Sequence, residues 1–121
     1  MDSYFENLKN IAITVCDAEG NILDMNQHSA DVNSKGQKII GYNLLNCHPE
    51  PAKTKLKGLL EHQELNAYTI EKTLTDGSKV KKLIYQTPWY KEDGSFGGLI
   101  EYSIEIPFEM PHFVRQPKPQ Q

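Results

Sequence analysis

The sequence predicts an α+β fold in which helices pack on one face of a five-stranded antiparallel sheet. Three observations support this prediction. Turn signals rich in Asp and Gly occur at residues 17–20, 76–77 and 92–94, and each lies between segments of strand-forming composition. Apolar residues alternate along these segments. About forty residues separate the second and third strands, and because structureless connections of that length are rare, they should hold helices.

The first two strands flank the turn at residues 17–20. Residues 11–16 form the first strand, because their isoleucine and valine side chains alternate and would share one face. Residues 21–25 follow the turn directly and form the second strand. A connection this short joins antiparallel neighbours.

The remaining three strands occupy residues 67–74, 80–89 and 99–106. The last has the clearest pattern, since Glu101 and Glu105 alternate with a run of apolar residues. We expect these two acids to lie on a solvated face of the sheet. The apolar residues that alternate with them are Ile100, Tyr102, Ile104 and Ile106.

The longest predicted helix spans residues 49–62. Proline and glutamate suit its first turn. Four apolar residues then recur at helical spacing, namely Ala52, Leu56, Leu59 and Leu60. Shorter turns of helix are expected at residues 26–33 and 36–42, with breaks at Gly36 and Gly41.

The chain has 121 residues, the size of one ordinary domain. Residues 1–9 are expected to form a short amphipathic N-terminal cap, and residues 10–107 the folded domain. Residues 108–121 are rich in proline and should form an extended or disordered tail.

Charge and composition argue against several classes of partner. The net charge is −3 and the isoelectric point is about 5.8, so no basic surface for nucleic acid is expected. No apolar run is long enough to cross a bilayer, and the N-terminus lacks the pattern of a signal peptide. We therefore expect a cytoplasmic protein without a membrane partner. In that reducing compartment Cys16 and Cys47 should be free thiols.

Signals of catalysis are absent from the sequence. It has no motif that pairs a nucleophile with a base, no phosphate-binding glycine loop and no paired carboxylates. The cysteines and histidines lack the spacing of a zinc site. From the sequence we therefore do not expect an enzyme or a metal site.

A run of residues in the first half of the chain resembles the PAS domain family. It comprises Asp17, residues 20–22 (Gly-Asn-Ile), Asn26, Ala30 and residues 41–44 (Gly-Tyr-Asn-Leu). The two later Asp-Gly turns are similar to the hairpin turns of that family. The likeness implies the strand order 2-1-5-4-3 and a cavity between the inner face of the sheet and the long helix. It also implies a sensory role in signal transduction, in a bacterial protein.

Three residues of this run have structural roles that follow from their chemistry. Asp17 can accept backbone N–H bonds in the first turn, and Gly20 can adopt a positive φ there. Asn26 can cap the helix that follows it.

The resemblance places a small organic ligand in the cavity, with signalling through a homodimer or a partner protein. The helix entry at residues 46–52 is more polar than is usual in the family. Cys47 and His48 lie there, close to a helix N-terminus that could bind an anionic group; alternatively, Cys47 packs inward and His48 bonds a backbone carbonyl. The candidate ligand-binding residues are Tyr42, Leu45, Cys47, His48, Leu56, Leu60, Tyr68, Ile84 and Tyr102.

Two other functions stay open. One is a structural dimerisation module whose core is filled. The other is a haem-based gas or redox sensor, with His48 or His62 as the axial ligand in an apolar pocket. Prolines follow Ile106 where the family usually continues into an output domain, so no attached output domain is expected.

Overall fold

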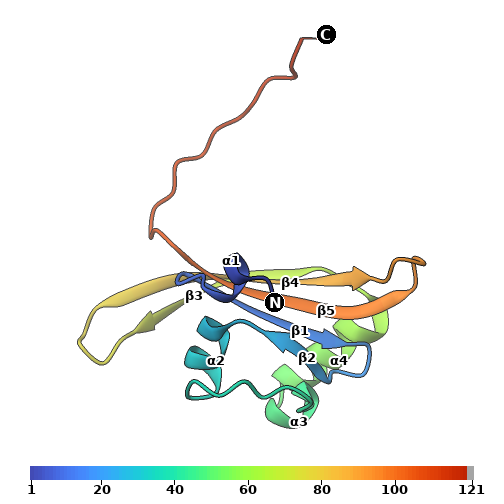
Figure 1. Ribbon diagram of the computed structural model, residues 1–121. Coiled ribbons are helices and arrows are strands. Elements are labelled where there is room, and N and C mark those ends of the chain that lie inside the picture. Colours follow the sequence, from blue (N-terminus) through green and yellow to red (C-terminus); the bar gives the residue numbers. More distant parts are fainter. Residues whose placement is uncertain (120–121) are drawn as a thin grey trace.

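The computed structural model describes residues 1–119 and contains one antiparallel sheet with the strand order β2-β1-β5-β4-β3 (Figure 1). The strands are β1 (Ile11–Asp17), β2 (Ile22–Met25), β3 (Asn66–Thr73), β4 (Lys79–Tyr90) and β5 (Phe96–Ile106). The helices are α1 (Ser3–Glu6), α2 (Gln27–Asn33), α3 (Leu44–Cys47) and α4 (Ala52–His62). Figure 1 shows α2, α3 and α4 on the same side of the sheet. The predicted fold class and strand order are confirmed.

Asn26 joins β2 to α2 and is completely buried. Its side-chain oxygen accepts hydrogen bonds from the backbone N–H of Ser29, which caps α2, and from that of Ile13 in β1, both at 3.0 Å. Its side-chain nitrogen donates to the carbonyl oxygens of Ile11 and Phe5, both at 2.9 Å. The predicted capping role is confirmed, and the same side chain also ties α1 and β1 together.

The helix predicted over residues 36–42 is wrong. This segment runs beside β2 instead, where the Ile22 N–H donates to the Tyr42 carbonyl and the Gly41 N–H donates to the Ile22 carbonyl, both at 2.8 Å. Gly41 has a φ of 90°, which is incompatible with a right-handed helix. The short helix α3 begins only after Asn43, whose side-chain oxygen accepts the Leu45 N–H.

The long helix α4 begins at Ala52, three residues after the predicted start, and ends at His62 as expected. Gln63 closes it in the left-handed conformation, with a φ of 54° and an N–H that donates to the Leu59 carbonyl. The buried face of α4 packs against the end of the sheet near Leu99. The residues of this core cluster are Cys16, Leu56, Leu59, Leu60 and Leu99.

The strand registers show which residues share each face of the sheet. Glu101 in β5 pairs with Thr14 in β1 and with Gln86 in β4, and Gln86 pairs with Asn66 in β3. These four side chains lie on the inner face, which the helices cover. The expectation that Glu101 is solvated is therefore wrong, because the polar set of β5 points inward. Glu105 belongs to the same set but lies near the sheet end and is exposed.

The outer face of the sheet is largely apolar. Tyr102 in β5 pairs with Ile13 in β1 and with Tyr85 in β4, so these residues share the face that points away from α2, α3 and α4. Most side chains of this face are half-buried. Its apolar members on the three central strands are Ile11, Ile13, Val15, Leu83, Tyr85, Ile100, Tyr102, Ile104 and Ile106.

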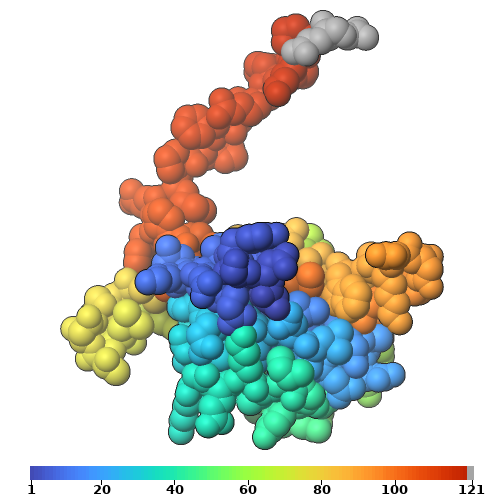
Figure 2. Space-filling view, viewed as in Figure 1, coloured from blue at the N-terminus to red at the C-terminus, as the bar shows by residue number. Residues whose placement is uncertain are grey.

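Residues 107–119 leave the sheet as an extended arm without helix or strand. Figure 2 shows the arm projecting from the body of the domain. Its large apolar side chains are 44–78% exposed, and they are Phe108, Met110, Phe113 and Val114. Residues 120–121, the end of the predicted tail, lie outside the described residues. Among residues 1–119, no helix is both long enough and apolar enough to cross a membrane.

Candidate functional site

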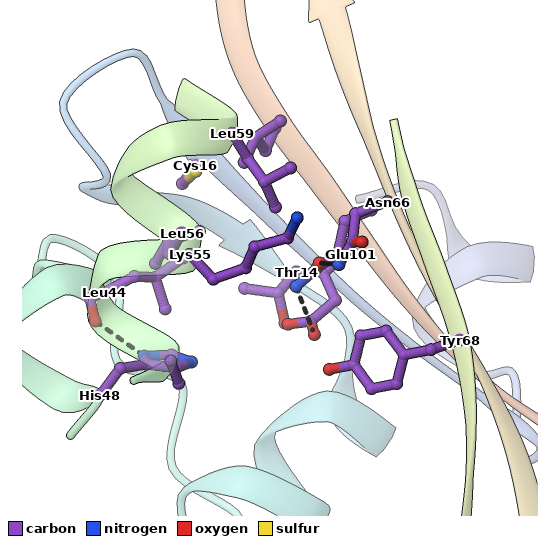
Figure 3. Close-up of a pocket in the computed structure, with 13 residues that line it drawn as sticks. Thr14, Cys16, Leu44, His48, Lys55, Leu56, Leu59, Asn66, Tyr68 and Glu101 are labelled. Carbon is purple, nitrogen blue, oxygen red and sulfur yellow. Dashed lines mark hydrogen bonds between the residues drawn. The ribbon is translucent and has the colours of Figure 1, made fainter. Parts of the chain in front are cut away.

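A cavity of about 340 Å³ lies between the inner face of the sheet and the helices α3 and α4 (Figure 3). This volume falls within the range of small-molecule sites, roughly 300–1,000 Å³. The cavity is lined by residues of both layers, which are Thr14, Cys16, Leu44, His48, Ala52, Lys55, Leu56, Leu59, Asn66, Tyr68, Gln86, Leu99 and Glu101. We call it the main cavity.

A chain of hydrogen-bonded polar side chains crosses the sheet wall of the main cavity. The Asn66 side-chain N–H donates to the Gln86 side-chain oxygen at 2.8 Å. The Gln86 side-chain N–H in turn donates to a Glu101 carboxylate oxygen at 3.3 Å. Gln86 thus accepts from Asn66 through its oxygen and donates to Glu101 through one of its two N–H groups. Figure 3 shows the Glu101 carboxylate and the Tyr68 hydroxyl turned toward the same space.

The environment of Glu101 disfavours its charged form. Burial raises the pKa of its carboxyl above the usual range, while the nearby His48 and the Gln86 hydrogen bond act in the opposite direction. Burial also raises the pKa of the Tyr68 hydroxyl, and the charge of Glu101 adds to that effect. Glu101 can therefore take up a proton more readily than an exposed glutamate, and it can then donate as well as accept a hydrogen bond.

The helical wall of the main cavity supplies two nitrogen groups. His48 follows α3, and its Nδ1 lies 2.7 Å from the Leu44 carbonyl oxygen, which orients the ring. This contact matches the expectation that His48 bonds a backbone carbonyl. Lys55 extends from α4 toward the sheet in Figure 3. The cavity therefore has an acidic and amide-bearing wall opposite a wall that carries an amine and an imidazole.

Two smaller cavities adjoin the main one and share Thr14 and Glu101 with it. One has a volume of about 250 Å³ and is lined by Thr14, Ile22, Met25, Asn33, Ile39, Leu44, Cys47, His48 and Glu101. The other has a volume of about 110 Å³ and is lined by Ala12, Thr14, Val32, Asn33, Ile70, Lys72, Lys82, Ile84, Glu101 and Ser103. Glu101 thus stands where the three spaces meet.

The candidate residues from the sequence fall into three groups. Three of them line the main cavity, namely His48, Leu56 and Tyr68. Cys47 and Ile84 line the adjoining cavities. The other four line none of these spaces: Leu60 and Leu45 belong to the packed core, Tyr42 is 61% exposed, and Tyr102 lies on the outer face.

Sequence reasoning missed the polar residues of the sheet wall, above all Glu101, Gln86 and Asn66. The alternation in β5 correctly separates the two sets of side chains, but it does not say which set faces the helices. A signal was available in β4, where Lys82 and Gln86 share a face with Ile84. A mixed polar and apolar face is typical of a binding surface.

The haem alternative can be tested against the same geometry. His62 is exposed at the end of α4. His48 lines the main cavity, but Glu101, Gln86 and Asn66 line it too, whereas a haem ligand needs an apolar slot. The residues present do not fit a haem. Within residues 1–119, no group of three potential ligand residues could hold a metal ion.

No protein-family model and no curated protein matches the chain. Solved structures do match. The PAS domain of a protein from Colwellia psychrerythraea is 23% identical, with a TM-score of 0.56, over 84% of this chain and 90% of that one. The PAS domain of Bordetella pertussis BvgS is 21% identical, with a TM-score of 0.59, over 86% of this chain and 82% of that one.

A third match is Vibrio cholerae VqmA, which is 15% identical, with a TM-score of 0.65, over 88% of this chain and 51% of that one. This chain therefore spans about half the length of VqmA. The similarity to the two PAS domains, together with the strand order and the position of the helices, leads to one conclusion. The chain has the fold of a PAS domain.

Proposed function

We propose that this chain is a sensory PAS domain that binds a small organic molecule in the main cavity. The observation that carries the proposal is the sheet wall of that cavity, where Glu101, Gln86 and Asn66 form a hydrogen-bonded chain beneath α4. Polar groups on the covered face of a sheet are costly unless they are fully paired. A wall of this kind is typical of a site that recognises a ligand.

The arrangement favours a ligand that has both a polar and an apolar part. Glu101 offers a carboxylate oxygen to a hydrogen-bond donor such as an amine, amide or hydroxyl group. Leu56 and Leu59 of α4 line the same space and would contact the apolar part of the ligand. Because the carboxyl carries a raised pKa, a bound donor group would stabilise its charged form.

A solved neighbour supports a small-molecule ligand for this fold. VqmA has been determined bound to DPO, at 16% identity to this chain and a TM-score of 0.63. That chain is nearly twice as long as the matched region, since only 56% of it is covered. Its ligand is a property of VqmA, and we propose for this chain only the class of ligand.

A binding role fits the thiol chemistry better than catalysis does. Cys16 is 1% exposed and lines the main cavity. Burial raises the pKa of its thiol, and the neighbouring acids Asp17 and Glu101 act in the same direction, against a hydrogen bond with the Leu99 backbone. A nucleophilic cysteine needs a lowered pKa. We therefore propose a binding module that is not an enzyme.

The outer face supports homodimerisation as the route of signalling. Tyr85, Tyr102 and Ile104 lie on this face and are half-buried in the single chain. A contiguous apolar surface of this kind commonly marks a contact with another protein. A purely structural dimerisation module with a filled core is less well supported, because the main cavity is open and its sheet wall is polar. A cytoplasmic location stays a prediction.

The proposal can be tested by native mass spectrometry of protein purified without denaturation, followed by thermal melting against a library of polar metabolites. We expect a retained molecule, or a hit that raises the melting temperature of the wild type. Glu101→Gln should weaken that binding at least tenfold. Glu71→Gln makes the same change on the exposed outer side of β3 and should leave binding unchanged. An empty protein that binds nothing in the library would contradict the proposal.

A further inference from the structure

Lys82 is a buried cation on the inner face of β4. Its side chain is only 7% exposed, and it lines the cavity of about 110 Å³ described above. Among residues 1–119, no carboxylate lies within 4 Å of its amine, and no protein group accepts a hydrogen bond from it. Buried lysines are rare unless they are paired. Lys82 therefore lacks the ion pair that usually offsets the cost of burying its charge.

The amine of Lys82 is not fully enclosed by the protein. In the described part of the chain, no fully enclosed side-chain nitrogen or oxygen lacks a hydrogen-bond partner. The Lys82 amine has no such partner, so it cannot be fully enclosed. The Lys82 side chain lines the cavity, so a group bound there would lie next to it.

A second lysine lines the same cavity. In β3, Ile70 pairs with Lys82, and Lys72 lies two residues further along the strand. Residues two apart in a strand point to the same side, so both lysines are on the inner face. Burial lowers the pKa of Lys82, and the positive charge of Lys72 adds to that effect, against the attraction of Glu105. Two cations thus line one small space.

Two acids stand near these lysines without pairing with them. Glu105 is the cross-strand partner of Lys82 but is exposed. Glu101 lines the cavity too, and its carboxylate accepts the Gln86 hydrogen bond. The positive charges are therefore not neutralised within ion-pair distance by the described residues, and an anionic group from outside the chain would supply the missing partner.

We propose that the cavity at Lys72 and Lys82 binds an anionic group, a carboxylate or a phosphate, carried by the molecule in the main cavity. This inference rests on the proposed function. Thr14 and Glu101 line both cavities, so one molecule can occupy both spaces. Its hydrogen-bond donor would meet Glu101, and its anionic end would lie between the two lysines, with the Ser103 hydroxyl on the same wall. The ligand is therefore a compact molecule with a donor and an anionic group.

The test is an NMR titration of ¹⁵N-labelled protein with sodium succinate, glycine and inorganic phosphate, with sodium chloride at matched ionic strength. We expect saturable shifts of the amides of Lys72, Lys82 and Ser103 with at least one probe. Glycine or succinate would identify a carboxylate site, and phosphate a phosphate site. Lys82→Gln should weaken the response at least tenfold, whereas Lys79→Gln, which removes a lysine at the exposed start of β4, should not change it.

The variant is expected to fold, because an unpaired buried charge is costly and the substitution removes it, and a melting curve checks this. Equal shifts with chloride, or equal binding by Lys82→Gln, would overturn the anion site. If the wild type and Lys82→Gln retained the same molecule equally well, the anion site would be overturned, but the proposed function would stand. Phosphate shifts at Lys82 in a protein that retains no molecule and binds nothing in the metabolite library would support the anion site and contradict the proposed function.

Discussion

Asn26 and Glu101 are both polar residues on covered parts of the fold, but they are used differently. Asn26 is completely buried and makes two donor and two acceptor contacts with the backbone. Glu101 accepts one hydrogen bond, from Gln86, and faces three cavities. The first side chain is saturated and structural, whereas the second keeps acceptor capacity for another molecule.

Replacement of Asn26 should strongly destabilise the domain. Asn26→Ala removes a helix cap and leaves the N–H of Ile13 and the carbonyl of Ile11 without these partners. Unpaired buried groups cost about 1–3 kcal/mol each, so we expect the free energy of unfolding to fall by about 3 kcal/mol. Urea denaturation measures this. Asn46→Ala, at an exposed position of α3, serves as the control, and an equal small loss for both variants would refute the role of Asn26.

Glu101 should make stability depend on pH. Because burial raises its pKa in the folded state above the usual 4.5, the folded protein binds this proton more tightly than the unfolded chain does. The favourable contribution is present below pH 4.5 and is lost as the pH rises through the raised pKa. Glu101→Gln should therefore match the wild type in acid and melt at a higher temperature at neutral pH. A variant that melts lower at neutral pH would contradict this.

At the scale of elements, the alternation of residues predicted the strands well and the faces less well. All five strands lie within a few residues of their predicted bounds, because turn residues and alternation are local properties. Which side of β5 meets the helices depends on where residues 26–62 pack, and that is a tertiary property. The error over residues 36–42 has a similar origin. This segment forms hydrogen bonds with Ile22 of β2, which is distant in sequence, and the next helix begins only after its N-cap residue Asn43.

The junction of β4, β5 and β1 requires two glycines that periodicity does not reveal. A Cβ atom on Gly97 would lie 2.4 Å from the Trp89 ring, and one on Gly98 would lie 2.0 Å from the Cys16 carbonyl oxygen. The Trp89 indole N–H donates to that same carbonyl at 2.9 Å. Close approach of the three strands therefore depends on the missing side chains.

Two alanine substitutions should have opposite effects. Gly97→Ala pushes into the Trp89 ring and should lower the free energy of unfolding by about 1–3 kcal/mol. Gly58→Ala lies inside α4, where an added Cβ meets nothing within 4 Å, and it should raise that free energy by about 0.5–1 kcal/mol. Chemical denaturation of both variants gives the comparison. A neutral Gly97→Ala would show that the Trp89 ring can move aside without cost.

At the scale of the whole molecule, the sheet separates two surfaces of different character. The inner face carries polar residues under the helices. The outer face carries apolar residues of the kind that usually form the core of a globular protein. The resemblance to PAS domains predicted a cavity. It did not place Glu101 there, because alternation along β5 suggests that its apolar residues face the core and its acids face solvent. A covering partner on the outer face would account for that inversion.

Homodimerisation through the outer face predicts a specific disruption. Ile104 lies on this face near the end of β5, opposite Leu83 of β4. Ile104→Glu should raise the dimer dissociation constant at least tenfold, which corresponds to about 1.4 kcal/mol. Analytical ultracentrifugation over a range of concentrations measures it. Gln37→Glu adds the same charge to an exposed loop and should have no effect. A wild type that stays monomeric at every concentration would refute the dimer.

The central claim is that the space between the sheet and α4 is open and recognises a ligand through Glu101. A crystal structure of protein purified without denaturation tests it most directly. The account predicts ordered density of an organic molecule in contact with Glu101, at the wall formed with Gln86 and Asn66. Side chains of Lys55 and Tyr68 folded inward to fill that space, with no room left for a ligand, would contradict it.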